Sequence, residues 1–255
     1  MQRIALVTGA SSGIGEAAAR RLAHDGYHVI VVARREDRLT QLAKEIGNAT
    51  PLALDLTEPG APDTVRDAIP GPLHLLVNNA GAAWRGRFYD GGYDNVARHM
   101  QLNFEAPLRL THALLPLLRE SAPSAIVNVA STAGRISRVN SAAYSASKFA
   151  LIGWSDGLYL EERPHGVHVG LVLPGFVSTE GFPQAELTRQ RLTRWAVSTP
   201  EKVADAIAQA AAGKAERYAP RPYALVPVLR SVAPALLRKL GNSAKLAPQT
   251  NSGER

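Results

Sequence analysis

The sequence predicts an α/β fold in which a mostly parallel sheet is covered by helices on both faces. Short runs rich in Val, Ile and Leu recur along the chain, and segments with helical periodicity lie between them. Most of these runs are apolar at nearly every position, as in parallel strands buried on both faces. Their alternation with helices is typical of a doubly wound sheet with right-handed crossovers.

The individual elements follow from length, β-branching and end signals. Six runs are predicted strands: Ile4–Thr8, His28–Ala33, Leu52–Leu56, Leu73–Asn78, Ala125–Ser131 and Val167–Leu173. A last strand is expected at Leu225–Val228, on an edge or at a bulge because Pro227 has no N–H. Thr199 and Pro200 mark a helix start. Helices are predicted over Gly13–Gly26, Arg35–Gly47, Tyr93–Arg119 (with Pro107 and Pro116 as points of kinking), Ala142–Arg163 and Pro200–Gly213.

Composition excludes several classes of protein. The 255 residues are 45% hydrophobic and 20% charged, unlike a disordered chain, a collagen or a coiled coil. The sequence contains no stretch of about 18 apolar residues, so no membrane span is expected. The apolar run after Arg3 is too short for a secretory signal. The absence of cysteine excludes disulfides and fits a reducing cytoplasm, where we expect the protein. The seven histidines show no metal-binding spacing, so no metal is expected.

Positive charge is concentrated late in the chain. Residues 1–188 hold 17 basic and 18 acidic side chains, whereas residues 189–255 hold 12 basic and 4 acidic ones. The surplus is scattered and accompanies no binding motif, so no nucleic-acid partner is expected. No linker is visible, and we predict one domain over residues 1–241, followed by a polar, disordered tail over 242–255.

A glycine-rich turn follows the first strand and precedes a helix. It reads Thr8-Gly9-Ala10-Ser11-Ser12-Gly13-Ile14-Gly15. Gly9 allows a tight turn, Gly13 lets the backbone approach a pyrophosphate, and Gly15 lets helix and strand pack closely. The helix N-terminus offers unpaired N–H groups to phosphates. The spacing is that of neither a P-loop nor the commonest dinucleotide fingerprint.

Two arginines follow the second strand. An acidic residue there favours NAD, whereas a basic residue accommodates the 2′-phosphate of NADP. Guanidinium groups bind phosphate in bidentate fashion. Arg34 is the first candidate and Arg35 the second, so NADP(H) is favoured and NAD(H) is left open.

A serine, a tyrosine and a lysine form the most specific pattern. Tyr144 and Lys148 are four residues apart on a predicted helix and share one face. A nearby ammonium lowers a tyrosine pKa toward neutral, so that the phenol can exchange a proton with a carbonyl or an alcohol. Ser131 ends a predicted strand, where its hydroxyl would hydrogen-bond the substrate oxygen.

These motifs resemble the short-chain dehydrogenase/reductase family, of the roughly 250-residue type. They cover residues 1–180 in family order: Thr8–Gly15, Asp55, Asn78-Asn79-Ala80-Gly81, Asn103, Ser131, Tyr144/Lys148, Pro174-Gly175 and Thr179. The resemblance implies a Rossmann-like domain with a seven-stranded sheet, which binds NAD(P) and reduces carbonyls or oxidises alcohols. It also implies a homodimer or homotetramer.

The resemblance implies roles for individual residues. Tyr144 is the acid/base, Lys148 tunes it and binds the nicotinamide ribose, and Ser131 donates to the substrate oxygen. Asn103 holds a water in a proton relay. The cofactor-binding residues are Gly9, Ser11, Ser12, Gly13, Ile14, Gly15, Arg34, Arg35, Asp55, Leu56, Asn79, Ala80, Gly81, Tyr144, Lys148, Pro174, Gly175, Val177 and Thr179. Some NADP-binding members carry a basic residue where this chain has Ser12.

The substrate is expected to be a lipophilic ketone or aldehyde. The pocket-forming segment 176–197 contains Phe182, Leu187, Leu192 and Trp195. The basic amphipathic segment 223–240 is expected to cover the pocket. Two less favoured alternatives are that it forms a subunit interface or that it contacts an anionic membrane surface. Alternative functions are an NAD(H)-dependent alcohol dehydrogenase and a non-catalytic, cofactor-binding regulatory protein. An epimerase or dehydratase would need a longer substrate domain.

Overall fold

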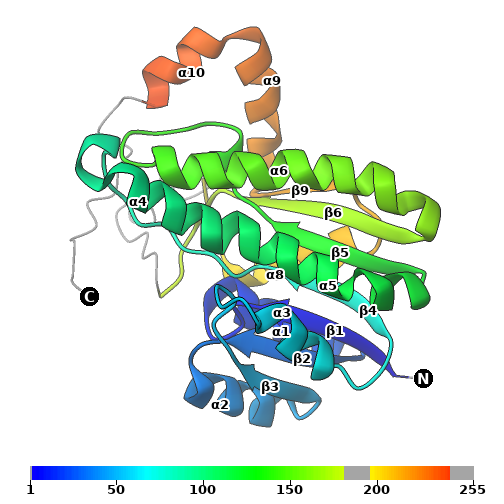
Figure 1. Cartoon of the computed structure of the whole chain (residues 1–255). Helices are drawn as coiled ribbons and strands as arrows, with labels where there is room; N and C mark the ends of the chain where they lie inside the picture. The colour runs from blue at the N-terminus through cyan, green and yellow to red at the C-terminus, as the bar shows by residue number, and fades with distance from the viewer. Residues whose placement is uncertain (1, 181–195, 242–255) are drawn as a thin grey trace.

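The computed structural model describes residues 2–180 and 196–241. Seven parallel strands form one sheet in the order β3-β2-β1-β4-β5-β6-β9 (Figure 1). Their bounds are β1 (Arg3–Thr8), β2 (Tyr27–Ala33), β3 (Ala49–Ala53), β4 (Leu73–Asn78), β5 (Ser124–Val129), β6 (Val167–Pro174) and β9 (Glu216–Ala219). The strand order reverses between β1 and β4, as in a Rossmann-like, doubly wound sheet. The predicted fold class is confirmed.

Helices cover both faces of the sheet. One face packs against α1 (Gly13–His24), α2 (Glu36–Ile46) and α8 (Pro200–Ala211). The other packs against α3 (Ala61–Asp67), α5 (Ala106–Glu120) and α6 (Ala142–Glu162). Alternate strand residues serve the two layers: in β1, Ala5 and Val7 join the first and Ile4 and Leu6 the second. Because both faces are buried, the strands are apolar throughout.

The long helix predicted over Tyr93–Arg119 is built from three pieces. Helix α4 (Phe88–Met100) runs into a π-helical turn at Gln101–Glu105, and α5 follows directly. Pro107 cannot supply the N–H that the Asn103 carbonyl would accept in a regular helix, which favours the wider turn. Pro116 lies inside α5 without ending it.

Two strand predictions need correction. Strand β3 begins three residues earlier than Leu52 and includes Pro51, which an edge strand tolerates. The predicted strand at Leu225–Val228 is wrong, because that segment belongs to helix α9 (Leu225–Val232). Pro227 lies in its first turn, where a backbone N–H has no helical partner. The seventh strand is β9, a short, polar edge strand that the apolar-run criterion missed.

Smaller elements complete the described chain. Strands β7 (Phe176–Val177) and β8 (Val197–Ser198) form a separate parallel pair. Thr199 caps α8 as predicted, since its hydroxyl accepts a hydrogen bond from the Lys202 amide. Helices α9 and α10 (Pro234–Gly241) extend from the body of the molecule beyond α6 (Figure 1).

Candidate active site

The glycine loop has the tight geometry that its sequence predicts. Gly9 and Gly13 both adopt positive φ, +67° and +58°. A Cβ on Gly15 would lie 2.2 Å from the Gly9 carbonyl oxygen, so only glycine lets α1 pack this closely on the end of β1. Ser12 precedes α1 and makes no side-chain capping bond, and Ile14 packs at the core margin. The turn and the helix N-terminus therefore fit a pyrophosphate.

Hydrogen bonds join this loop to the end of β4. The Thr8 hydroxyl accepts from the amides of Asn79 (2.9 Å) and Ala80 (3.0 Å). The Asn79 side chain donates to the Thr8 carbonyl at 2.9 Å. A Cβ on Gly81 would lie 2.9 Å from Asn103 Oδ1 and 3.4 Å from Lys148 Nζ. Residues predicted to line one cleft thus meet at the switch point between β1 and β4.

Ser131 and Tyr144 come together beyond the end of β5. The Ser131 hydroxyl accepts from the Ala133 amide at 3.1 Å and lies close enough to the Tyr144 phenol to influence its pKa. Burial raises the pKa of Tyr144, and the Ser131 hydroxyl and the charge of Arg85 offset this only in part. The predicted lowering of the Tyr144 pKa by Lys148 is therefore wrong for the chain by itself, because loss of hydration is the largest influence.

Lys148 is buried four residues farther along α6. Its Nζ donates to the Val129 carbonyl at 3.0 Å, at the carboxyl end of β5. Burial lowers the Lys148 pKa to about 8. A side chain this close to losing its proton near neutral pH is suited to proton exchange rather than to a permanent ion pair.

Asn103 connects the π-helical turn to this cluster. Its amide group exchanges two hydrogen bonds of 2.9 Å with the backbone of Ala82, and it donates to the Ser147 hydroxyl at 3.1 Å. Ser147 in turn donates to the Tyr144 carbonyl at 2.8 Å. Asn103 and Ser147 are fully buried, so the hydrogen bond between them is protected from water. No motif in the sequence pointed to the part that Ser147 plays.

The two arginines after β2 take different positions. Arg35 donates to the Ser11 hydroxyl at 3.0 Å and the Ser12 hydroxyl at 2.7 Å, so it is held against the glycine loop. Arg34 is 77% exposed and lies 3.7 Å from the Asp55 carboxylate. Burial raises the Asp55 pKa, but hydrogen bonds from Thr57 and the charge of Arg34 leave it lowered overall. Leu56, which follows Asp55, is buried in the core layer beneath this edge.

The segment after β6 closes the other side of the cleft. Thr179 lies over the loop, since a Cβ on Gly13 would meet its Cγ2 at 3.1 Å. The Gly175 amide, after Pro174, donates to the Ala219 carbonyl at 2.8 Å. Val177 is buried in the small β7–β8 pair. Four predicted pocket residues lie outside the described residues: Phe182, Leu187, Leu192 and Trp195.

His99 is a neighbour of the site to which no motif in the sequence pointed. It is fully buried, and its ring meets that of Tyr144 edge-on, with centroids 6.1 Å apart. Its Nε2 accepts from the Trp84 amide (3.0 Å), so its Nδ1 donates to the Asn95 carbonyl (2.7 Å). Burial lowers the His99 pKa, which favours this neutral tautomer. His99 thus fixes the loop of Trp84 beside Tyr144.

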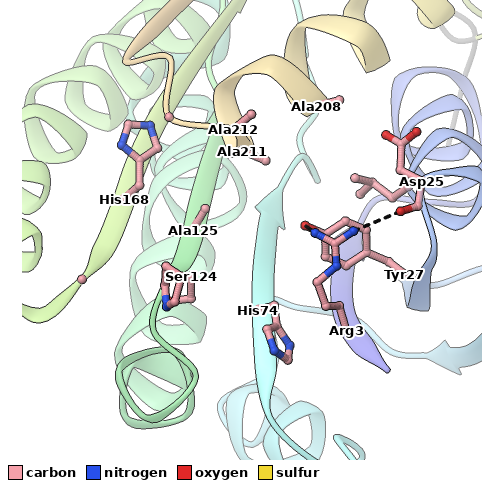
Figure 2. A pocket seen from close by; sticks show the side chains of 14 residues that line it. Arg3, Asp25, Tyr27, His74, Ser124, Ala125, His168, Ala208, Ala211 and Ala212 are labelled. Atoms are coloured by element: carbon pink, nitrogen blue, oxygen red, sulfur yellow. Dashed lines mark hydrogen bonds between the residues drawn. The ribbon is translucent and has the colours of Figure 1, made fainter. Parts of the chain in front are cut away.

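A separate hollow of the described chain lies away from this site. A cavity of about 480 Å³ opens at the amino ends of the strands, where Arg3, Tyr27, His74 and His168 line it (Figure 2). Arg3 covers the Tyr27 ring at 4.3 Å and donates to the Asp25 carbonyl. The cavity is thus at the opposite edge of the sheet from Tyr144. Within residues 2–180 and 196–241, no cluster of three or more His, Asp or Glu side chains could hold a metal ion.

A doubly wound sheet with a glycine loop beside a cluster of Ser131, Tyr144 and a buried Lys148 defines a class of nicotinamide-dependent oxidoreductases. Comparison with known proteins agrees. The family model for short chain dehydrogenase matches residues 3–190, and the chain belongs to this family. It is an oxidoreductase of the type that interconverts carbonyl and CH–OH groups.

Relatives share about a third of their aligned residues with this chain. Ketoacyl reductase HetN of Nostoc sp. is 34% identical, over 82% of this chain and 75% of its own. 3-Dehydrosphinganine reductase of Danio rerio is 32% identical, over 78% of this chain and 65%, just under two thirds, of its own. The solved structure of a variant of actinorhodin polyketide ketoreductase with NADPH has a TM-score of 0.74 and 31% identity, covering 85% of this chain and 95% of its own.

Proposed function

We propose that this chain is an NADP(H)-preferring reductase of lipophilic ketones or aldehydes. The observation that carries the proposal is the convergence of Asn103, Ser131, Tyr144 and Lys148 beside the glycine loop. When bound, the nicotinamide would supply the hydride or accept it. The protein's own task is then to orient the two reactants and to move one proton.

The reductive direction requires Tyr144 to be protonated. Burial raises the pKa of Tyr144 in the chain by itself, so its phenol carries a proton at neutral pH that could be donated to a carbonyl oxygen. Ser131, close to the same phenol, would donate to that oxygen as negative charge develops on it. Lys148 and Asn103 would resupply the proton and hold the backbone of the cleft.

The cofactor preference rests on the residues after β2. Arg34 is exposed and has only a loose contact with Asp55, so it is available to a 2′-phosphate. Arg35 orders the serines of the glycine loop. The ketoreductase structure with NADPH supports the preference by analogy. NAD(H) use remains the alternative, since Ser12 adds no positive charge.

The substrate class rests on the walls of the cleft and on the names of relatives. The Trp84 ring lies against His99, next to Tyr144, and Phe176 is buried beneath the Arg138 guanidinium, which lies 4.3 Å from its ring centre. The names of two relatives refer to ketoacyl and sphinganine ketones. A ketone on a long apolar chain fits both observations. Assembly as a homodimer or homotetramer and a cytoplasmic location stay predictions.

The test is NADPH consumption with a panel of ketones, aldehydes and acyl thioesters, repeated with NADH. The proposal expects turnover of apolar ketones, with a higher kcat/KM for NADPH. Tight NADPH binding by fluorescence without turnover of any carbonyl would instead indicate a cofactor-binding regulatory protein. Equal kcat/KM with NADH would contradict the cofactor preference.

A further inference from the structure

Helices α9 and α10 carry a stripe of exposed apolar side chains. The exposed fractions are 69% for Leu225, 59% for Val228, 73% for Val232 and 50% for Leu236. These positions are three to four residues apart, so within each helix they lie on one face. Leu237 is more than nine-tenths buried, whereas the stripe has no partner among the described residues. Four large side chains exposed together cost free energy unless something covers them.

The same segment is uniformly basic. Residues 217–241 contain Arg217, Arg221, Arg230, Arg238 and Lys239, and no acidic residue. Arg230, Arg238 and Lys239 belong to the two helices themselves. Apolar side chains beside basic ones, on short helices, are the pattern of an interfacial amphipathic segment.

Contacts hold α9 next to the catalytic helix. Arg230 donates to the Arg135 carbonyl at 2.6 Å, and its guanidinium lies 4.5 Å from the centre of the Phe149 ring. Phe149 follows Lys148 on α6. The two helices stand outside the sheet-and-helix body (Figure 1). Whatever binds the stripe therefore lies near the active-site cleft.

We propose that α9 and α10 dock this protein on a membrane surface rich in anionic lipids. The apolar stripe would enter the boundary of the acyl chains, and the basic side chains would meet the lipid phosphates. The proposed contact is peripheral, made by two short helices of eight residues each. Among the described residues, no helix is long and apolar enough to cross a membrane. A carbonyl substrate with a long apolar chain could then pass from lipid to enzyme, although the docking surface does not depend on that substrate.

Two other roles for the stripe, a subunit interface and a lid over the protein's own core, fit the observations less well. A symmetric interface with a second copy would bring Arg238 and Lys239 of both copies together on one patch, without a carboxylate from this segment to neutralise them. A lid over the protein's own core would bury the stripe, whereas its side chains are 50–73% exposed. An anionic lipid surface satisfies both the charge and the exposed apolar area.

The test is sedimentation of the full-length protein with two kinds of vesicles, phosphatidylcholine alone and phosphatidylcholine mixed with phosphatidylglycerol. We expect binding to the anionic vesicles that falls as salt rises, because the charges lie at the surface. Arg238→Gln with Lys239→Gln should weaken binding about 25-fold, at roughly five-fold for each charge. Leu225→Ser with Val232→Ser should weaken it at least about ten-fold.

A matched control is Leu160→Ser, which removes a leucine of similar exposure, 70%, from the other end of α6. It should leave vesicle binding unchanged. NADPH binding by each variant reports that it is folded. Equal binding to both kinds of vesicles, or unchanged binding by both double variants, would overturn the proposal. So would a dimer, seen by analytical ultracentrifugation, that Leu225→Ser with Val232→Ser dissociates in the absence of vesicle binding.

Discussion

The two edges of the sheet differ in what surrounds their openings. The amino edge holds a hollow of about 480 Å³, which is lined in part by surface contacts such as Arg3 on the Tyr27 ring. The carboxyl edge holds buried polar side chains, Asn103, Ser147 and Lys148, each hydrogen-bonded to another group of the cleft. A hollow at one edge and a cluster of buried, hydrogen-bonded polar side chains at the other thus lie at opposite ends of the same strands.

The difference follows from the topology. In a parallel sheet with helical crossovers, each chain segment leaves a strand at its carboxyl end and enters the N-terminus of a helix. That edge therefore collects tight turns and unpaired N–H groups, as at Gly9–Gly13 before α1. The amino edge receives the C-terminal ends of helices, which present carbonyl groups. The following predictions test whether function is confined to the carboxyl edge.

The largest expected effect is a loss of kcat, and a tyrosine at each edge of the sheet provides the comparison. Tyr144→Phe removes the proposed proton donor and should lower kcat about 10²–10⁴-fold. Tyr27→Phe removes a hydroxyl that accepts from Arg3 in the amino-edge cavity and should leave kcat within about two-fold. Steady-state NADPH oxidation measures both. A comparable loss in both variants would mean that the amino edge takes part in turnover.

A second pair of variants separates catalysis from stability. The Lys148 pKa falls from 10.5 to about 8 on folding, so between these values the unfolded chain binds one proton more than the folded chain. The stability of the wild type therefore rises with pH through this window, and at pH 7 the full penalty for burying the charge is present. Lys148→Met should lose activity and yet gain up to about 3 kcal/mol of unfolding free energy at pH 7, the equivalent of the shift in the Lys148 pKa.

That gain should shrink as pH rises through about 8 toward 10.5, which urea unfolding at several pH values would show. Lys44→Met is the control, because Lys44 is an exposed residue on α2. It should change unfolding free energy by less than about 0.5 kcal/mol at any pH in this range. If the gain for Lys148→Met were constant with pH, hydrophobic packing rather than the buried charge would explain it.

Much of the fold could be predicted because burial on both faces makes the central strands apolar. The predicted Leu73–Asn78 matches β4, and Val167–Leu173 lacks only one residue of β6. The same criterion fails at the edges. Strand β9 reads Glu-Arg-Tyr-Ala and is polar, because an edge strand pairs with a neighbouring strand on one side only and is less buried. Conversely, Leu225–Val228 is apolar although it is helical.

The residues of the candidate site could be predicted where the chemistry requires one residue type. They could not be predicted where several residue types would fill the same position. Glycines with positive φ and a Tyr–Lys pair leave a trace in the sequence. The neighbours of that pair do not, because any small hydroxyl or buried ring could occupy their places. His99 against Tyr144 and Ser147 against Asn103 emerged only from the structure.

The two arginines after β2 should contribute differently to cofactor binding. Arg34→Gln removes an exposed cation and should weaken NADPH binding about ten-fold while leaving NADH binding unchanged. Arg35→Gln removes the hydrogen bonds to Ser11 and Ser12 and should weaken both cofactors. Fluorescence titration of each variant with both cofactors measures this. A selective loss of NADPH binding in Arg35→Gln, with none in Arg34→Gln, would reverse the assignment.

The smallest effect concerns an ion pair that spans the carboxyl edge. Arg38 on α2 makes two hydrogen bonds, of 2.6 and 2.9 Å, to the carboxylate of Glu180. Glu180 follows Thr179, so the pair ties α2 to the segment that lies over Gly13. Both side chains are about half exposed, and water and salt therefore screen most of their attraction.

Arg38→Gln and Glu180→Gln should each raise the Kd for NADPH no more than about five-fold. The double variant should be no weaker than the poorer single variant, because either substitution already breaks the pair. The difference should vanish in high salt. Additive losses would show that the two residues act separately on the cofactor. The glycine loop and the segment after β6 would then each be held in place independently, by their own contacts to the sheet.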